Sequence, residues 1–269
     1  MKKDANFEIL KGDSFKILAN LEPSTFDFIF ADPPYLLSND GLSVKSGKQV
    51  SVNKGKWDKS QGFDEDLDFH LRWISLCKEL LSSNGTIAIS GTRHSIYKCG
   101  IALEVLGFRI LNEIIWFKPN GAPNLTGRNF AESHETIIWA SKSKKSKHTF
   151  NYEAMKVYDD SGDKLKSVGK QMRDVWSIPT TPMREKEYGK HPTQKPLELL
   201  ERLILACSKE GDLVLDPFCG SGTTGVASVK HNRHFVGIEK DPEYCKLSGK
   251  RIKEQLKGAT IDKGRQGRS

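Results

Sequence analysis

The sequence predicts an α/β protein built on a doubly wound, mostly parallel sheet. Short apolar runs alternate with segments of helical periodicity along most of the 269 residues. Several of these runs end in glycine or acidic residues, as strands do where they leave a sheet. There is no internal repeat and no long low-complexity segment. This alternation is typical of helices packed on both faces of a parallel sheet.

Apolar and aromatic runs define the expected strands, and apolar residues at helical spacing define the helices. Strands are expected at residues 7–10, 26–29, 86–90, 108–111, 113–117, 136–140, 213–215 and 235–238. Helices are expected at residues 15–21, 64–82, 95–106, 196–208, 224–230 and 242–256. Ser14 is the expected cap of the first helix, and Asn84-Gly85 the expected end of the second. The stretch 108–117 and the strand 136–140 can pair as an antiparallel hairpin at the edge of the sheet.

Composition limits the class of protein. The chain is long enough for a substantial core without disulfide or metal support, and its five cysteines are scattered without metal-ligand spacing. We therefore expect reduced thiols, a cytoplasmic location and no metal site. The sequence has no signal core and no run long enough to span a membrane. The net charge of +8 favours an anionic partner without identifying one.

The first candidate site is a strand that ends in Asp32-Pro33-Pro34-Tyr35. Two prolines remove two backbone donors and fix two φ angles, so the chain leaves the sheet along one stiff path. A carboxylate, two carbonyls and an aromatic ring thus cluster at the carboxyl end of a strand, where open α/β sheets bind ligands. A plain proline turn with Tyr35 packed in the core is the structural alternative.

Methyl transfer to an exocyclic amine is the chemistry that suits this cluster. The amine of adenine is a poor nucleophile because its lone pair is delocalised into the ring. Acceptors aimed at both N–H bonds favour a pyramidal, more nucleophilic nitrogen. Asp32 and the carbonyl of Pro33 can supply these acceptors, while Tyr35 stacks on a base flipped out of its strand.

The second candidate site is a glycine turn after the strand 213–215. Its residues are Asp216, Phe218, Gly220, Ser221, Gly222 and Thr223. The glycines allow a tight turn, the next helix presents free N–H groups, and the following strand ends in Glu239, placed for ribose hydroxyls. A phosphate-binding loop would require a lysine after the second glycine, and a dinucleotide site a third glycine. Asp216 instead suits an ammonium group, such as that of S-adenosylmethionine. A purely structural glycine turn is the remaining alternative.

Two segments lie outside the α/β alternation. Residues 37–60 are rich in Ser, Gly, Asn and Lys, and we expect a mobile loop that contacts the substrate. Residues 141–190 hold 12 basic and 7 acidic residues with interleaved aromatic side chains. A solvated charged excursion is the ordinary explanation of such a run. Its position between the two candidate sites favours a nucleic-acid-recognition insertion.

Taken together, these motifs resemble the β class of amino-DNA methyltransferases, in which the Asp-Pro-Pro-Tyr motif precedes the Phe-x-Gly-x-Gly motif. The resemblance covers roughly residues 7–256 and implies a Rossmann-like methyltransferase fold with S-adenosyl-L-methionine as cofactor. It implies a catalytic role for Asp32, Pro33, Pro34 and Tyr35, and a cofactor-binding role for the glycine turn and Glu239. The resemblance also matches a segment that closes over the methionine end of the cofactor to Thr193, Gln194 and Lys195. Asp13 matches a position near the cofactor's adenine.

Asp rather than Ser before the two prolines resembles the adenine-N6 form of the family. Likeness to the second adenine methylase of GATC restriction–modification systems implies a GATC target, activity on single strands and a companion endonuclease. It rests on Leu37-Ser38-Asn39, on residues 49–58 and on Ala122-Pro123-Asn124-Leu125. Alternatives are a cytosine-N4 DNA or an adenine RNA methyltransferase, or an idle nucleic-acid-binding protein. The predicted organisation is a single domain over residues 1–256, with a polar basic tail over 257–269 and homodimerisation left open.

Overall fold

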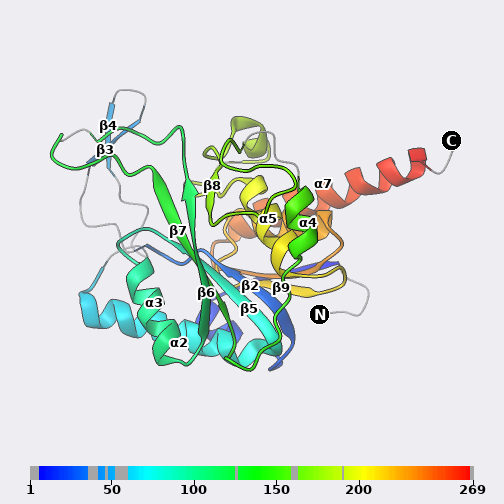
Figure 1. Ribbon diagram of the computed structural model, residues 1–269, viewed down its shortest axis with the longest axis horizontal. Coiled ribbons are helices and arrows are strands. Elements are labelled where there is room, and N and C mark those ends of the chain that lie inside the picture. Colours follow the sequence, from blue (N-terminus) through cyan, green and yellow to red (C-terminus); the bar gives the residue numbers. More distant parts are fainter. Residues whose placement is uncertain are drawn as a thin grey trace.

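The computed structural model describes residues 6–35, 42–45, 48–51, 60–124, 127–158, 163–189 and 191–266. Over these residues the chain forms an eight-stranded sheet in the order β1-β10-β9-β2-β5-β7-β6-β8, with helices on both faces (Figure 1). The strands are β1 (Phe7–Lys11), β2 (Phe26–Ala31), β5 (Leu81–Gly91), β6 (Arg109–Phe117), β7 (His134–Ser141), β8 (Val175–Ser177), β9 (Leu213–Asp216) and β10 (His234–Glu239). β7 runs against both of its neighbours, and the other neighbouring pairs are parallel. The predicted doubly wound, mostly parallel α/β fold is confirmed.

Helices cover the two faces of the sheet as two groups. The longer helices are α2 (Phe63–Leu80), α3 (Ile96–Val105), α5 (Leu197–Cys207), α6 (Thr223–Lys230) and α7 (Pro242–Gln266), with short α1 (Ser14–Leu18), α4 (Tyr152–Val157) and a 3₁₀ turn η2 (Met183–Lys186). α2 packs with α3 and α1, whereas α6 packs with both α5 and α7. Figure 1 shows α2 and α3 side by side, on the other side of the sheet from α5 and α7. Among the described residues, none of these helices has the length and apolar character needed to cross a membrane.

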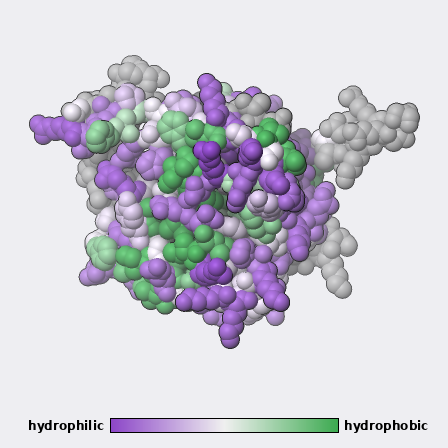
Figure 2. All heavy atoms as spheres, in the orientation of Figure 1, coloured by the Kyte–Doolittle hydropathy of each residue, from purple (hydrophilic) through white to green (hydrophobic). Residues whose placement is uncertain are grey.

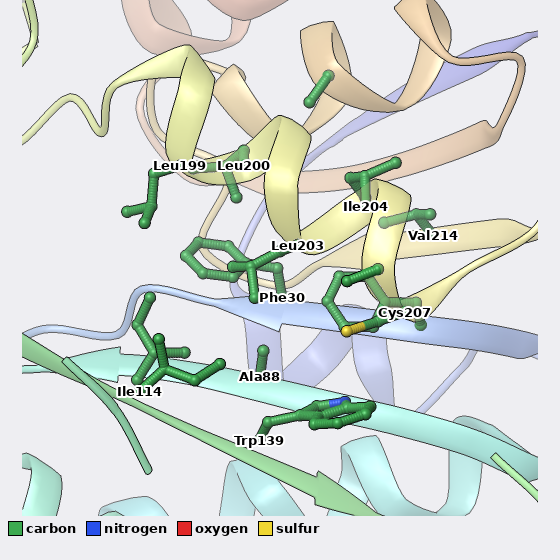
Figure 3. Close-up of a cluster of buried hydrophobic side chains, with 14 of the residues drawn as sticks. Phe30, Ala88, Ile114, Trp139, Leu199, Leu200, Leu203, Ile204, Cys207 and Val214 are labelled. Atoms are coloured by element: carbon green, nitrogen blue, oxygen red, sulfur yellow. The ribbon is translucent and has the colours of Figure 1, made fainter. Parts of the chain in front are cut away.

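Alternation along β2 divides the core between these two groups. Phe28 and Phe30 belong to the cluster that contains α5, whereas Ile29 and Ala31 belong to the cluster that contains α2. Figure 3 shows Phe30 beside Leu203 of α5 on one face of the sheet. Full burial of each large apolar side chain contributes about 1.5–3 kcal/mol. β2 is therefore firmly held, and the motif that follows it starts from a fixed point.

Two helix boundaries differ from those expected. Asp13, not Ser14, caps α1, because its carboxylate accepts the N–H of Lys16 at 3.3 Å while the Ser14 hydroxyl donates to the carbonyl of Pro217. α2 ends at Leu80, before Asn84-Gly85, which lie within β5. Leu81 takes an extended conformation because it is buried in the core and pairs with Phe26.

The sheet edge also differs from the prediction. β6 and β7 pair antiparallel as expected, with a register shift between Ile110 and Asn112, but they are not the edge of the sheet. β8, from within residues 141–190, adds to the outer side of β6. Asp163 fixes this segment with a 2.6 Å ion pair to buried Arg202 and accepts the N–H of Ser177. The insertion is therefore partly integrated into the core.

Expectations for residues 37–60 and for the tail meet the structure only in part. β3 (Leu42–Lys45) and β4 (Lys48–Ser51) form an antiparallel hairpin where a loop was expected. Residues 37–41, 46–47 and 52–59 of that loop, and Leu125, lie outside the described residues. The closing helix was expected to stop at Leu256, but α7 continues to Gln266. Helix propensity does not explain the extension, because the added run contains Gly258 and Gly264, which are poor helix formers.

On the face shown in Figure 2, hydrophilic side chains surround smaller hydrophobic patches.

Candidate active site

A cavity of about 800 Å³ lies at the carboxyl ends of β2, β9 and β10. Its volume is that of a typical small-molecule site. Fourteen of the fifteen predicted site residues line it: Asp13, Asp32, Pro33, Pro34, Tyr35, Thr193, Gln194, Lys195, Asp216, Phe218, Gly220, Ser221, Thr223 and Glu239. The two candidate sites are therefore two parts of one cavity.

Gly222 is the predicted residue that does not line the cavity. It precedes α6 with φ of 76°, in the left-handed region that favours glycine. A Cβ at this position would lie 2.6 Å from the Cβ of Ser248. Gly222 therefore gives α7 room to pack against the glycine turn, rather than giving a ligand access to the backbone.

Arg251 of α7 stabilises the same turn through hydrogen bonds. Its buried guanidinium donates to the carbonyl of Ser221 at 2.7 Å and to the hydroxyl of Thr223 at 3.0 Å. The closing helix thus stabilises the turn that separates β9 from α6. Sequence reasoning did not single out Arg251, because a basic residue in a charged helix carries no local signal of burial.

Glu239 has a fixed carboxylate at the end of β10. One oxygen accepts the N–H of Gly220 at 2.8 Å, and the other accepts the N–H of Asp241 at 2.8 Å. Each carboxylate oxygen can accept a further hydrogen bond. Glu239 can therefore orient hydroxyl groups of a ligand in the cavity.

Asp216 adds negative charge at the end of β9. It accepts the hydroxyl of Thr224 at 2.5 Å and the N–H of Phe218 at 3.0 Å. Burial raises the pKa of Asp216 to about 7 in spite of these bonds, and the neighbouring charges of Asp32 and Glu239 add to the shift. Five acidic residues line the cavity, namely Asp13, Asp32, Asp216, Glu239 and Asp241. Such a cavity suits a ligand that carries positive charge.

Thr193 and Gln194 lie in the segment before α5. The side-chain nitrogen Nε2 of Gln194 donates to the backbone carbonyl of Glu185 at 2.8 Å. The hydroxyl of Thr193 lies 3.3 Å from Nδ1 of His191. Within the described part of the chain, the buried Oε1 of Gln194 has no hydrogen-bond partner. The ring of His191 packs edge-on against Tyr244, with 4.3 Å between centroids.

Lys195 points away from this segment, toward Asp32. Its ammonium donates to Oδ2 of Asp32 at 2.6 Å and to the hydroxyl of Tyr35 at 2.8 Å. Burial raises the pKa of Asp32; Lys195 opposes the shift and Glu135 adds to it. Burial alone would lower the pKa of Lys195, but the carboxylates of Asp32 and Glu135 outweigh it and raise that pKa.

Tyr35 is buried, and its hydroxyl lies at the centre of this network. It lies 2.5 Å from Oδ1 of Asp32, 2.9 Å from Oε2 of Glu135 and 3.2 Å from the hydroxyl of Ser90. Burial and then the two carboxylates raise the pKa of the phenol well above its usual value, so it stays protonated. The ring lines the cavity, but the hydroxyl is a polar member of the site, which the stacking prediction did not include.

Glu135 was missed by the sequence reasoning. It lies near the start of β7 and pairs with Lys118 at 3.2 Å and with Lys195 at 3.4 Å. Burial opposes its ionisation, but the two ammonium groups lower the pKa of Glu135 to about 2. A single acidic residue at the start of an apolar strand gives no sign of such contacts until the strand order is known.

Comparison with known proteins identifies the family. A family model described as DNA methylase matches residues 26–250. The chain belongs to this family. The DNA methylase chain is 52% identical over 256 residues to Type II methyltransferase M2.LlaDCHI of Lactococcus lactis subsp. cremoris, covering 95% of this chain and 91% of the relative. It is also 52% identical to Type II methyltransferase M2.DpnII of Streptococcus pneumoniae, covering 92% and 90% of the two chains.

Solved structures agree with this assignment. The crystal structure of the M1.HpyAVI–SAM complex has 28% sequence identity and a TM-score of 0.65, covering 91% of this chain and 98% of that chain. The PvuII cytosine-N4-specific DNA methyltransferase is similar in fold, with 20% identity and a TM-score of 0.70, covering 92% of this chain and 86% of that chain. The DNA methylase is thus a site-specific DNA methyltransferase that uses S-adenosylmethionine and acts on DNA. The predicted family, fold, cofactor and enzyme class are confirmed.

The charged and hydrogen-bonding groups that line the cavity fit this cofactor. S-adenosylmethionine carries a sulfonium, an ammonium, a carboxylate and ribose hydroxyls. Asp216, Glu239 and Asp32 supply negative charge, and the oxygens of Glu239 have acceptor capacity for hydroxyls. The orphaned amide oxygen of Gln194 is a further acceptor at the same cavity.

Proposed function

We propose that this DNA methyltransferase transfers the methyl group to N6 of adenine. The observation that carries the proposal is that Asp32, followed by two prolines and Tyr35, shares one cavity with the glycine turn and Glu239. Bound S-adenosylmethionine supplies an electrophilic methyl group. An acceptor for the amine and a binding site for the cofactor therefore face the same space.

In this proposal Asp32 and the carbonyl of Pro33 accept the two hydrogens of the target amine. This polarises the amine and directs its lone pair into the cavity. Tyr35 covers the base with its ring and holds Asp32 in place with its hydroxyl. The flipped base fills the mouth of the cavity and excludes water.

The cofactor residues have separate proposed roles. Glu239 accepts hydrogen bonds from the ribose, and Asp216 faces the ammonium group. Asp13 lies near the adenine of the cofactor, while the glycine turn and Thr193-Gln194 enclose the methionine part. Lys195 belongs to the base half of the site, since its ammonium contacts Asp32 and Tyr35.

The recognition sequence and partners also belong to the proposal. Similarity to M2.DpnII and M2.LlaDCHI supports a restriction–modification role for this chain. We propose GATC as the target, in double and single strands, and a companion endonuclease. Residues 37–60 and 141–190 are the proposed DNA-contacting segments of a single domain over residues 1–256. A cytoplasmic location and homodimerisation are further parts of the proposal.

The experiment is transfer of labelled methyl from S-adenosylmethionine to DNA, followed by chromatography of the nucleosides. Duplex and single-stranded oligonucleotides with GATC are compared with the same strands carrying a scrambled site. The proposal predicts N6-methyladenine from the GATC strands alone. N4-methylcytosine as the product would overturn the target assignment, and equal label in the scrambled strands would overturn the recognition sequence.

A further inference from the structure

The part of the site proposed to bind the target base contains four charged side chains, and their charges sum to zero. Asp32 and Glu135 supply two carboxylates, while Lys195 and Lys118 supply two ammonium groups. Side-chain exposure is 16% or less for each of the four. Buried charges require partners, so these four groups depend on one another.

Both oxygens of Asp32 are engaged in this arrangement. Oδ2 accepts Lys195 at 2.6 Å and Oδ1 accepts the hydroxyl of Tyr35 at 2.5 Å. An amine that approaches Asp32 must therefore compete with a buried ammonium. Asp32 becomes a better acceptor for the amine only if another anion takes over Lys195.

Glu135 is placed to be that anion. Its Oε2 lies 3.4 Å from the ammonium of Lys195, about 0.5 Å longer than a charge-assisted hydrogen bond. Lys195 can therefore move toward Glu135 without leaving the hydroxyl of Tyr35, which lies 2.8 Å away. The hydroxyl of Tyr35 has a single proton and lies within hydrogen-bond distance of the carboxylates of Asp32 and Glu135. It can therefore donate to Asp32 when the ammonium of Lys195 donates to Glu135.

Strand direction explains why Glu135 reaches this place. β7 runs against β5, so the start of β7 lies at the edge of the sheet where the parallel strands end. Trp116 pairs with Glu135, and Lys118 follows β6 at the same edge. The position of Glu135 is thus set by rigid strands rather than by a loop.

We propose that Glu135 is a positioning residue that receives Lys195 when the target amine occupies Asp32. The inference rests on the proposed role of Asp32 and deepens it. Glu135 acts through Lys195. Lys195 then shares Glu135 with Lys118, while the hydroxyl of Tyr35 and the target amine donate to the carboxylate of Asp32.

The decisive variant is Glu135→Gln, measured by single-turnover methylation with saturating DNA and cofactor. Lys195 then has Asp32 as its one carboxylate partner, and we expect the rate to fall roughly ten- to a hundredfold. Cofactor affinity should change less than about twofold, because Glu135 does not line the cavity. Glu113→Gln, an exposed carboxylate on neighbouring β6, is the matched control and should keep the wild-type rate.

The pH profile separates positioning from a general loss of structure. The charged and polar groups facing Asp32 are Lys195, Tyr35 and Glu135, with Lys118 behind Glu135 and Asp216 across the cavity. Glu135 raises the pKa of Asp32, so Glu135→Gln should move the acid limb of the rate profile to lower pH. A lower rate with an unmoved limb would overturn the inference.

Two further variants keep the test independent of folding and of the proposed function. Glu135→Gln with Lys118→Gln removes one charge of each sign and should show the same loss of rate. In a Lys195→Met background, Glu135→Gln should cause no further loss, and an additive loss would overturn the inference. If Asp32→Ala is inactive while Glu135→Gln matches wild type, only this inference fails. If Asp32→Ala stays active, the proposed function fails.

Discussion

The carboxylate of Glu239 accepts the backbone N–H of Gly220 at 2.8 Å, and this bond joins the end of β10 to the turn after β9. The two parallel strands are neighbours, with Gly237 opposite Asp216. One side chain therefore both shapes the glycine turn and presents acceptor oxygens to the cavity.

Glu239→Ala should weaken binding of S-adenosylmethionine by about 1–3 kcal/mol, because charge-assisted hydrogen bonds to the ribose are lost. Calorimetric titration of the purified variant measures this. Glu243→Ala, which removes an exposed carboxylate at the start of α7, is the control. Equal dissociation constants for Glu239→Ala and wild type, with both folded, would remove Glu239 from the site.

The raised pKa of Asp216 predicts that the free energy of unfolding of the ligand-free protein depends on pH. Its pKa is about 7 in the folded state, against a usual 3.8. Between these values the folded protein binds more protons than the unfolded chain, so its free energy of unfolding falls as pH rises. Asp216→Asn should remove up to about 4 kcal/mol of this fall between pH ~4 and ~7. Urea unfolding across this range checks it, and parallel curves for wild type and variant would contradict it.

Tyr35→Phe tests the hydroxyl apart from the ring. A stacking role alone predicts activity close to wild type. The hydroxyl contacts Asp32, Glu135 and Lys195, so its removal takes one hydrogen bond from each of these buried charged groups. We expect the activation free energy of single turnover to rise by about 1–3 kcal/mol. Fluorescence of 2-aminopurine at the target position should still report flipping, since the ring remains. A wild-type rate for Tyr35→Phe would show that the hydroxyl is not needed and that Tyr35 acts by stacking alone.

The basic residues of segment 141–190 should differ in their effect on DNA binding. Ser141 pairs with Thr86, so β7 ends at the edge of the sheet opposite the cavity, and Lys144 and Lys145 follow it there. Arg184 and Lys186 lie on η2, beside the segment that carries Gln194. Neutralising this second pair should flatten the log–log salt dependence of DNA binding by up to about two units. The pair Lys144 and Lys145 is the control, and a larger change there would reverse the assignment.

Local signals in the sequence were sufficient for the strands of the large sheet other than β8, for the two motifs and for the family. Asp32 and Glu239 follow apolar runs, so their place at strand ends could be predicted directly. Glu135 and Arg251 could not, because their roles depend on strand order and on the packing of α7. Leu81 shows the same limit at a boundary, since pairing with Phe26 ended a helix that periodicity extended.

The central claim is that Asp32 directs methyl transfer to N6 of adenine. Its most direct test is sequencing of modified bases in DNA from a methylase-free host that expresses wild type or Asp32→Ala. The account predicts N6-methyladenine at one recurrent sequence with wild type and none with Asp32→Ala, although the variant still binds S-adenosylmethionine. Methylation by Asp32→Ala at the wild-type level, or N4-methylcytosine in place of N6-methyladenine, would contradict it.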